Sequence, residues 1–214
     1  MAPKSSTAGT ISAINLNELR IRLTGTRPLL LARGEAANPF DEQARKIKPL
    51  SQKKKKTDAE HEALARLQFE SSCYYDEEIG PYMPVDNILK CLEQGAAKGY
   101  KEGTDVKSLV VIKGFVGREI DNGAARINYT GPRDLDGLYA DKRFVLMKMG
   151  KVPSTRTRIL TVRPIFMEWN IEFLIEFMEI PKERIMDYLN ISGRLVGLGA
   201  WRPRHGLFVP EIVK

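Results

Sequence analysis

The spacing of apolar residues predicts that the chain begins with a strand. From 17 to 24, aliphatic residues alternate with polar ones, and Arg20 and Arg22 fall on the polar side. This alternation is typical of a strand with one buried face, so the other face is expected to be basic. A bend at 26–28 separates the strand from the short apolar run 29–31, which we expect to be buried.

Strand patterns dominate the second half of the chain. A buried strand is expected at 109–112 and a hairpin at 114–123. Further strands are expected at 144–149, 157–169, 170–178 and 207–213. A helix is expected to begin near Pro181, since proline is tolerated in the first helical turn. Helices and strands therefore mix in an α+β order, and no internal repeat of solenoid length is visible.

A lysine-rich segment follows the first strand. Seven of the twelve residues from Arg45 to Lys56 are basic, and so many like charges predict a mobile loop. Thr57 and Glu60 have the spacing of a capping box, which predicts a helix from about 58 to 70. The expected buried side of this helix is Ala63, Leu64 and Leu67.

A second helix is expected at about 86–98, capped by Asp86 or Asn87 and ended by Gly99. We interpret residues 1–12 as a disordered tail and 13–214 as one domain, into which 38–75 is inserted as a basic loop and helix.

Composition indicates a basic globular protein. Lys and Arg number 34 against 27 Asp and Glu, which gives a net charge of +7, and 43% of residues are hydrophobic. A basic balance favours nucleic acid, acidic proteins or anionic membranes as partners. No apolar run approaches the roughly 20 residues of a spanning helix, so we expect no membrane association. Two unpatterned cysteines, Cys73 and Cys91, favour a reducing, cytoplasmic location with both thiols buried.

Few residues point to catalysis. The chain has two histidines, His61 and His205, and lacks the common zinc, phosphate-loop and nucleophile-elbow motifs. The triplet Asp76-Glu77-Glu78 is typical of a solvated turn. We therefore expect no enzyme, no metal, no cofactor and no small-molecule substrate. A nuclease that uses His205 as general acid or base remains one alternative.

Basic residues gather in several segments that we predict to bind nucleic acid. Lysines and arginines release counterions when they neutralise phosphates, and arginine and tryptophan stack on bases. The predicted set is Arg20, Arg22, Arg45, Lys46, Lys48, Lys53, Lys54, Lys55, Lys56, Arg156, Arg158, Arg163, Trp201, Arg202 and Arg204. Gly197, Gly199 and Gly206 complete it, since glycines let backbone amides approach phosphate. A plain helix-to-strand connection with Trp201 in the core is the alternative for this last segment.

Three motifs occur in one order. They are Thr26-Arg27-Pro28-Leu29-Leu30, Pro81-Tyr82-Met83-Pro84, and Gly197-Leu198-Gly199 with Gly206. In this order they resemble the RAMP superfamily of CRISPR-associated RNA-binding proteins. The resemblance implies an α+β fold with a ferredoxin/RRM-like core of RAMP type and a C-terminal glycine-rich loop. RAMP proteins of the backbone type assemble along RNA as a filament.

A second set of motifs spans most of the chain. It comprises Asn38-Pro39-Phe40, Lys53–Lys56, Arg163-Pro164-Ile165-Phe166-Met167-Glu168-Trp169, and the segment from Gly197 to Gly206. These resemble a group of uncharacterised phage and prophage proteins, which implies a phage origin and a bacterial host cell.

Together these features predict a non-enzymatic protein that grips the backbone of single-stranded DNA or RNA, as a filament or other homo-oligomer. The alternative is a phage protein-interaction component, either a virion or assembly protein or an inhibitor of a host defence complex.

Overall fold

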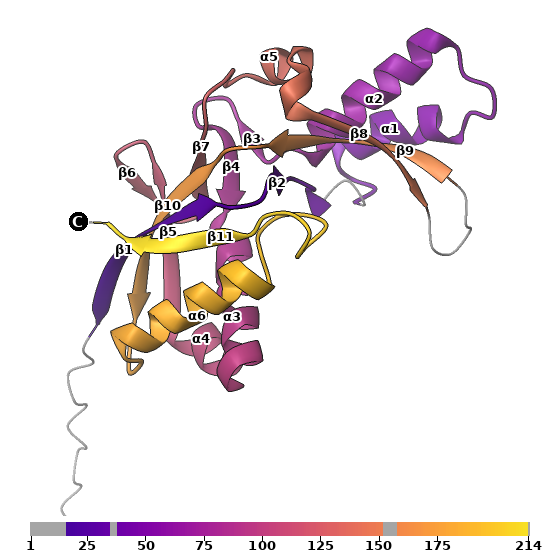
Figure 1. Ribbon diagram of the computed structural model, residues 1–214. Helices are drawn as coiled ribbons and strands as arrows, with labels where there is room; N and C mark the ends of the chain where they lie inside the picture. Colours follow the sequence, from indigo (N-terminus) through magenta and orange to yellow (C-terminus); the bar gives the residue numbers. More distant parts are fainter. Residues whose placement is uncertain (1–15, 35–37, 152–157, 214) are drawn as a thin grey trace, which may run out of the picture.

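A computed structural model describes residues 16–34, 38–151 and 158–213 (Figure 1). Within these ranges, no helix has the length and apolar character needed to cross a bilayer. The elements in chain order are β1 (Asn17–Gly25), β2 (Leu29–Leu30), α1 (Glu42–Gln52), α2 (Asp58–Ser72), β3 (Tyr75–Asp76), β4 (Gly80–Pro84), α3 (Val85–Tyr100), α4 (Gly103–Leu109), β5 (Val110–Val116), β6 (Glu119–Asp121), β7 (Ala124–Asn128), α5 (Leu135–Ala140), a 3₁₀ turn (Lys142–Phe144), β8 (Val145–Lys151), β9 (Arg158–Phe166), β10 (Asn170–Phe177), α6 (Lys182–Leu195) and β11 (Phe208–Ile212).

A mixed α/β architecture is built on an antiparallel central sheet. Strand β1 lies between β11 and β10, and the far edge of β10 pairs first with β7 and then with β5. Strand β7 continues the sheet to β4 and β3, and β6 extends β5 as a hairpin. The strand at 17–24 and the hairpin at 114–123 are thereby confirmed.

Helices α3 and α6 cover one face of this sheet and pack against each other (Figure 1). The strand side chains beneath them are fully or almost fully buried, among them Ile21, Leu23, Ile171, Phe173, Ile175 and Phe177. The two helices approach closely at Gly95, where a Cβ atom would lie 2.0 Å from the hydroxyl of Ser192. That hydroxyl donates to the Cys91 carbonyl at 3.0 Å.

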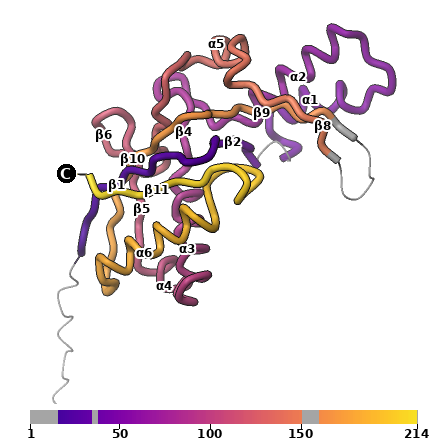
Figure 2. Tube along the Cα trace, in the orientation of Figure 1, coloured from indigo at the N-terminus to yellow at the C-terminus, as the bar shows by residue number. Residues whose placement is uncertain are grey.

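A second, smaller sheet joins β2, β9 and β8 in that order, and β2 pairs with the inner end of β9. Helix α2 packs on β9, and α1 packs on α2. We call α1, α2, β8 and β9 the arm, because they project together from the central sheet (Figure 2).

The lysine-rich segment is a helix for most of its length, not the expected loop. Asp41 caps α1 by accepting from the Ala44 amide at 3.0 Å, and Lys46 pairs with Glu42 one turn earlier. No residue of α1 is buried, so the lysines stay in solvent and their charge does not oppose the helix. Only 53–57 connects α1 to α2 without helix.

Helix α2 begins with the predicted capping box. The Glu60 amide donates to the Thr57 hydroxyl at 3.3 Å, and the Thr57 amide donates to the Glu60 carboxylate at 2.9 Å. Its buried side differs from the prediction: Ala65 and Phe69 are buried, whereas Ala63 is exposed. The side is rotated because α2 lies on β9 and places Phe69 5.2 Å from the ring of Tyr139.

Two further expectations are wrong in detail. Helix α3 has no side-chain cap at its start and runs through Gly99 to Tyr100, where Lys101 ends it in the left-handed conformation. Strand β5 begins at Val110 and leaves Val111 52% exposed, so 109–112 is not a continuous buried run. The preceding residues form α4, which the apolar pattern did not predict.

Both cysteines are buried and free, as expected. Burial raises the pKa of each thiol to about 12.

Candidate nucleic-acid interface

The loop from 197 to 206, here called the glycine loop, joins α6 to β11. Gly197, Gly199 and Gly206 all have positive φ angles, which only glycine adopts without strain. The loop lies directly on the backbone after β1: the Gly206 amide donates to the Pro28 carbonyl at 2.8 Å and the Ala200 amide to the Leu30 carbonyl at 2.7 Å. A Cβ atom on Gly199 would lie 2.3 Å from the Leu30 carbonyl oxygen.

These contacts give the glycines a packing role. The amides of Gly197 and Gly206 donate to backbone carbonyls inside the protein, at 2.8 Å each. The sequence predicts that glycine amides approach phosphate, but the amides of Gly197 and Gly206 hold the loop in place instead. The loop buries Leu198 and His205 and presents Trp201, Arg202, Pro203 and Arg204 to solvent.

Trp201 is one of those side chains. It is 38% exposed, not packed in the core. The guanidinium of Arg163 lies over its ring, 5.4 Å from the centroid, and the ring of His205 meets it edge-on at 5.9 Å. Burial lowers the pKa of Arg163, but an arginine side chain keeps its proton in proteins, so the guanidinium is charged.

Several cations surround this aromatic pair. Burial of His205, assisted by the nearby charges of Lys148, Arg204 and Arg27, lowers its pKa below 6.5. Lys148 comes from β8, Arg163 from β9, Arg204 from the glycine loop and Arg27 from the bend after β1. Within the described ranges, none of these four cations forms a salt bridge.

We call Arg27, Lys148, Arg163, Arg204 and Trp201 the loop cluster. Apart from partly buried Arg163, its members are exposed. An exposed group of uncompensated cations around an aromatic ring is suited to an anionic ligand with a flat, stackable group.

On the outer face of the central sheet, unlike at the loop cluster, carboxylates pair with the arginines. Arg20 and Arg22 both donate to the carboxylate of Glu172, at 2.6 and 2.8 Å, and Arg22 also pairs with Glu211. Burial of Glu172 opposes its ionisation, but the hydrogen bonds from both arginines outweigh that effect and lower its pKa. Their charge is therefore largely compensated before any ligand arrives.

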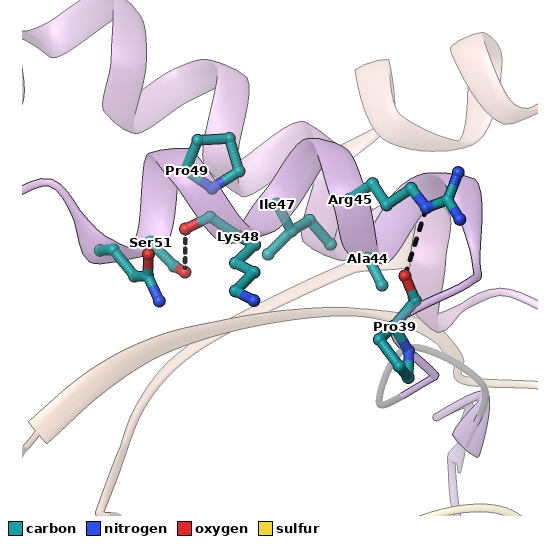
Figure 3. Close-up of a pocket in the computed structure, with 8 residues that line it drawn as sticks. Pro39, Ala44, Arg45, Ile47, Lys48, Pro49 and Ser51 are labelled. Atoms are coloured by element: carbon teal, nitrogen blue, oxygen red, sulfur yellow. Dashed lines mark hydrogen bonds between the residues drawn. The ribbon is translucent and has the colours of Figure 1, made fainter.

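Some basic residues of the arm pair with carboxylates, and others donate hydrogen bonds to backbone carbonyls. Lys46 pairs with Glu42 and Lys53 with Glu60, whereas Lys56 donates to the carbonyls of Ser51 and Lys53. Arg45 and Lys48 line an open hollow of about 610 Å³ beside α1, in which the Arg45 side chain donates to the Pro39 carbonyl at 3.2 Å (Figure 3).

Lys54 and Lys55 have no salt bridge in the structure as described. Figure 1 places the turn that carries them at the far end of the arm from the glycine loop. Arg156 lies outside the described residues. Arg158 begins β9 opposite Lys151, and its side chain is not described.

No protein-family model and no curated protein matches this chain. Among solved structures, it is similar to a chain from the cryo-EM structure of type III-B Cmr-β bound to cognate target RNA, with 13% sequence identity. The superposition has a TM-score of 0.46 and covers 92% of this chain and 59% of that chain. This chain therefore spans about three fifths of the length of the chain it matches.

Metal-ligating side chains do not gather at the loop cluster or elsewhere in the described ranges, where no group of three or more His, Cys, Asp or Glu could hold an ion. His61 is exposed on α2, and His205 is 8% exposed beside Trp201.

Of the loop cluster, the sequence prediction includes Arg163, Trp201 and Arg204 but not Arg27 and Lys148. Arg27 stands in a bend, and Lys148 stands in a strand with no charge pattern of its own. Only the long-range contacts that bring the bend, the arm and the glycine loop together place these residues near one another, and no local signal encodes that proximity.

Proposed function

We propose that the loop cluster binds the phosphate backbone of single-stranded DNA or RNA, and that the chain acts by binding rather than catalysis. The observation that carries the proposal is the gathering of four cations beside Trp201: Arg163 lies over its ring, and Arg27, Lys148 and Arg204 lie near His205, which meets the ring edge-on. Among the described residues, none of the four has a carboxylate partner. Each cation can neutralise a phosphate and release its counterions, and the indole can stack on one base.

Two features favour a single strand and little sequence preference. Phosphate contacts position a nucleic acid but carry no sequence information. An aromatic ring stacks on any base, provided that the base is not already stacked inside a duplex. A cluster made of cations and one indole therefore suits an unpaired strand.

We also infer a ferredoxin-like core of the RAMP type, formed by β1, α3, β5, β10, α6 and β11. The strand order β11–β1–β10–β5, antiparallel at every step, supports this inference. The positions of the helices also fit this motif: α3 follows the first core strand, α6 follows the third, and the two helices pack against each other on one face of the sheet. The phage origin and the cytoplasm of a bacterial host remain part of this proposal through the sequence motifs given above.

A second candidate, self-association through the arm, is favoured by the exposed apolar residues of β8 and β9. Met147, Met149 and Leu160 are 44%, 63% and 38% exposed, and Met149 and Leu160 line a groove of about 510 Å³ next to α2. Strand β8 pairs only with β9 among the described residues. Its free edge suits antiparallel pairing with β8 of a second copy, which would cover these methionines in both.

Fluorescence anisotropy with labelled single-stranded DNA and RNA tests the binding proposal. We expect the protein to bind both at low salt, and Arg163→Gln with Arg204→Gln to weaken binding at least tenfold. Arg118→Gln removes an equally exposed arginine from the β5–β6 turn and serves as the matched control. Equal affinities of the double variant and the control would contradict the proposal.

Two further measurements address the other parts. We expect oligonucleotides to remain intact after long incubation with the protein, and their cleavage would overturn the proposal of binding without catalysis.

Light scattering should show a dimer that Met149→Lys converts to a monomer, since a charge on an edge strand opposes pairing. A wild-type monomer would dispose of self-association through β8.

A further inference from the structure

A second hollow adjoins the glycine loop, apart from the four cations of the loop cluster. Its volume is about 550 Å³, and it is lined by residues from α3, the end of α6 and the loop itself: Gln94, Lys98, Leu195, Val196, Gly199, Ala200, Trp201, Arg202 and Pro203. Trp201 lines this loop pocket, whereas Arg163, which stacks on the same ring, does not. The indole is therefore a wall shared by the loop cluster and the loop pocket.

The polar side chains of the loop pocket can donate hydrogen bonds to an anion. Gln94 and Lys98 lie four residues apart on α3 and so share one face of the helix. The Arg202 guanidinium lies 3.4 Å from both the Gln94 side-chain oxygen and the Gly197 carbonyl. No aspartate or glutamate lines the pocket, and neither Lys98 nor Arg202 forms a salt bridge in the ranges described.

The apolar residues give the pocket a surface for a sugar or a base. Leu195 is 58% exposed at the end of α6, whereas Ile185, Tyr188 and Leu189 of the same helix are buried. Leu195 and Pro203 both line the same hollow. The hollow is open and mostly polar, so it suits a solvated backbone with a partly exposed nucleoside rather than an enclosed small molecule.

We propose that the strand held at the loop cluster crosses the edge of Trp201 and continues into the loop pocket. There Lys98 and Arg202 hold the next phosphate, and Leu195 and Pro203 contact the attached nucleoside. This inference rests on the proposed function, because it extends the same strand by one nucleotide. It assigns Lys98, a residue with no basic neighbours on α3 in its own turn, to nucleic-acid binding.

The shared wall favours one continuous ligand over two separate ones. The two cationic groups flank a single indole, so a strand that stacks a base on Trp201 has its backbone directed toward both. An acidic peptide in the loop pocket would have no such dependence on the loop cluster. If the strand enters the pocket, replacing Lys98 should weaken the binding of long oligonucleotides more than that of short ones. If the pocket binds an acidic peptide instead, replacing Lys98 should leave oligonucleotide binding unchanged at every length.

The test measures the affinity of Lys98→Gln for a single-stranded dodecamer and for a trinucleotide by competition anisotropy. Lys182→Gln, at the opposite end of α6, removes an equally exposed charge and is the matched control. We expect Lys98→Gln to weaken dodecamer binding about fivefold and to reduce the log–log salt slope by about 0.7, the value for one lost phosphate contact. The four cations of the loop cluster can hold all the phosphates of the trinucleotide without the loop pocket, so the trinucleotide should bind the variant and the wild type equally.

Three outcomes overturn the inference in distinguishable ways. If Lys98→Gln matches Lys182→Gln while Arg163→Gln still weakens binding, the strand does not enter the pocket but the proposed function stands. If Lys98→Gln weakens the trinucleotide as much as the dodecamer, the pocket belongs to the first site and is no continuation. If the wild type binds neither oligonucleotide, the proposed function itself fails.

Discussion

The guanidinium of Arg163 lies over the indole of Trp201, with its central carbon 5.4 Å from the ring centroid. Arg163 comes from β9 in the arm and Trp201 from the glycine loop after α6. The contact therefore joins two parts of the chain that the strand order of the central sheet does not link. It also holds a charge and a stacking surface together at the point where we propose that nucleic acid binds.

Tryptophan fluorescence should report on this contact. Trp169 is buried, with its ring nitrogen donating to the Arg27 carbonyl at 2.9 Å, whereas Trp201 is exposed. We expect single-stranded DNA or RNA to quench the emission of Trp201 through base stacking, and Trp201→Phe to abolish the quenching. Trp201→Ala should lose about 1–3 kcal/mol of binding free energy, the usual value of one stacked base.

Trp169 supplies the control for this experiment. Its emission remains in Trp201→Phe, so a variant that is still quenched by oligonucleotide would show that the signal does not come from stacking on Trp201.

Alanine at Gly206 should destabilise the protein strongly. The glycine has a φ of 72°, and a Cβ atom there would lie 1.8 Å from the Leu198 carbonyl oxygen. We expect Gly206→Ala to lower the free energy of unfolding in urea by more than about 3 kcal/mol, from backbone strain and overpacking together.

A matched substitution at Gly117 separates backbone strain from overpacking. It also has a positive φ, of 66°, but no atom lies within 4 Å of its would-be Cβ. Gly117→Ala should therefore cost only the conformational strain, about 1–2 kcal/mol. Equal losses in the two variants would contradict the packing role of the glycine loop.

The pH dependence of stability should reflect His205. Burial first, and then the charges of Lys148, Arg204 and Arg27, lower its pKa below 6.5. In the window between this lowered value and 6.5, the unfolded chain binds a proton that the native protein does not, so the free energy of unfolding decreases as the pH falls. His205→Gln lacks this proton and should lose less stability.

Urea unfolding at pH values from about 7.5 to about 5.5 measures this difference. Groups common to both proteins cancel when the variant is subtracted from the wild type. A difference that is flat across the window, or one that grows in the opposite direction, would contradict the assigned shift.

Lysines at the tip of the arm should act without affecting the fold. Lys54 and Lys55 form no salt bridge in the described structure, whereas Lys53 pairs with Glu60, a member of the α2 capping box. We expect the double change of Lys54 and Lys55 to Ser to weaken binding of long oligonucleotides, with the urea midpoint unchanged. Lys53→Ser should instead cost about 0.5 kcal/mol of stability at most, since its ion pair is largely solvated.

The comparison of a long with a short oligonucleotide decides whether the tip contacts the same strand. Equal weakening for both lengths would place the effect in long-range attraction, and no weakening for either would remove these lysines from the interface.

The sequence predicts the central sheet well because its signals are local. The alternation in β1 and β10 and the capping box of α2 each lie within a few residues. The prediction from sequence is wrong at α1. The many lysines predict a loop there, whereas the Asp41 cap and the Glu42–Lys46 ion pair stabilise a helix. A helix that buries nothing leaves no apolar pattern from which to infer it.

The candidate site is predictable only in part for a similar reason. Trp201 and its arginines stand out as a composition-biased segment, and Arg20 and Arg22 stand out in the same way. Only the structure separates the two groups, since Glu172 compensates the arginines of β1 from 150 or more residues away. Charge in the sequence does not show which cations remain without partners.

The salt dependence of binding tests the central claim most directly. Titration from about 50 to about 200 mM salt should give a log–log slope of about −3 or steeper for a single strand, since the four cations of the loop cluster contribute about 0.7 each. Replacement of Arg27, Lys148, Arg163 and Arg204 by Gln should make the slope shallower by about 3 and strongly weaken binding at the lower salt concentration. A wild-type slope that these substitutions leave unchanged would contradict the assignment of the loop cluster as the nucleic-acid site.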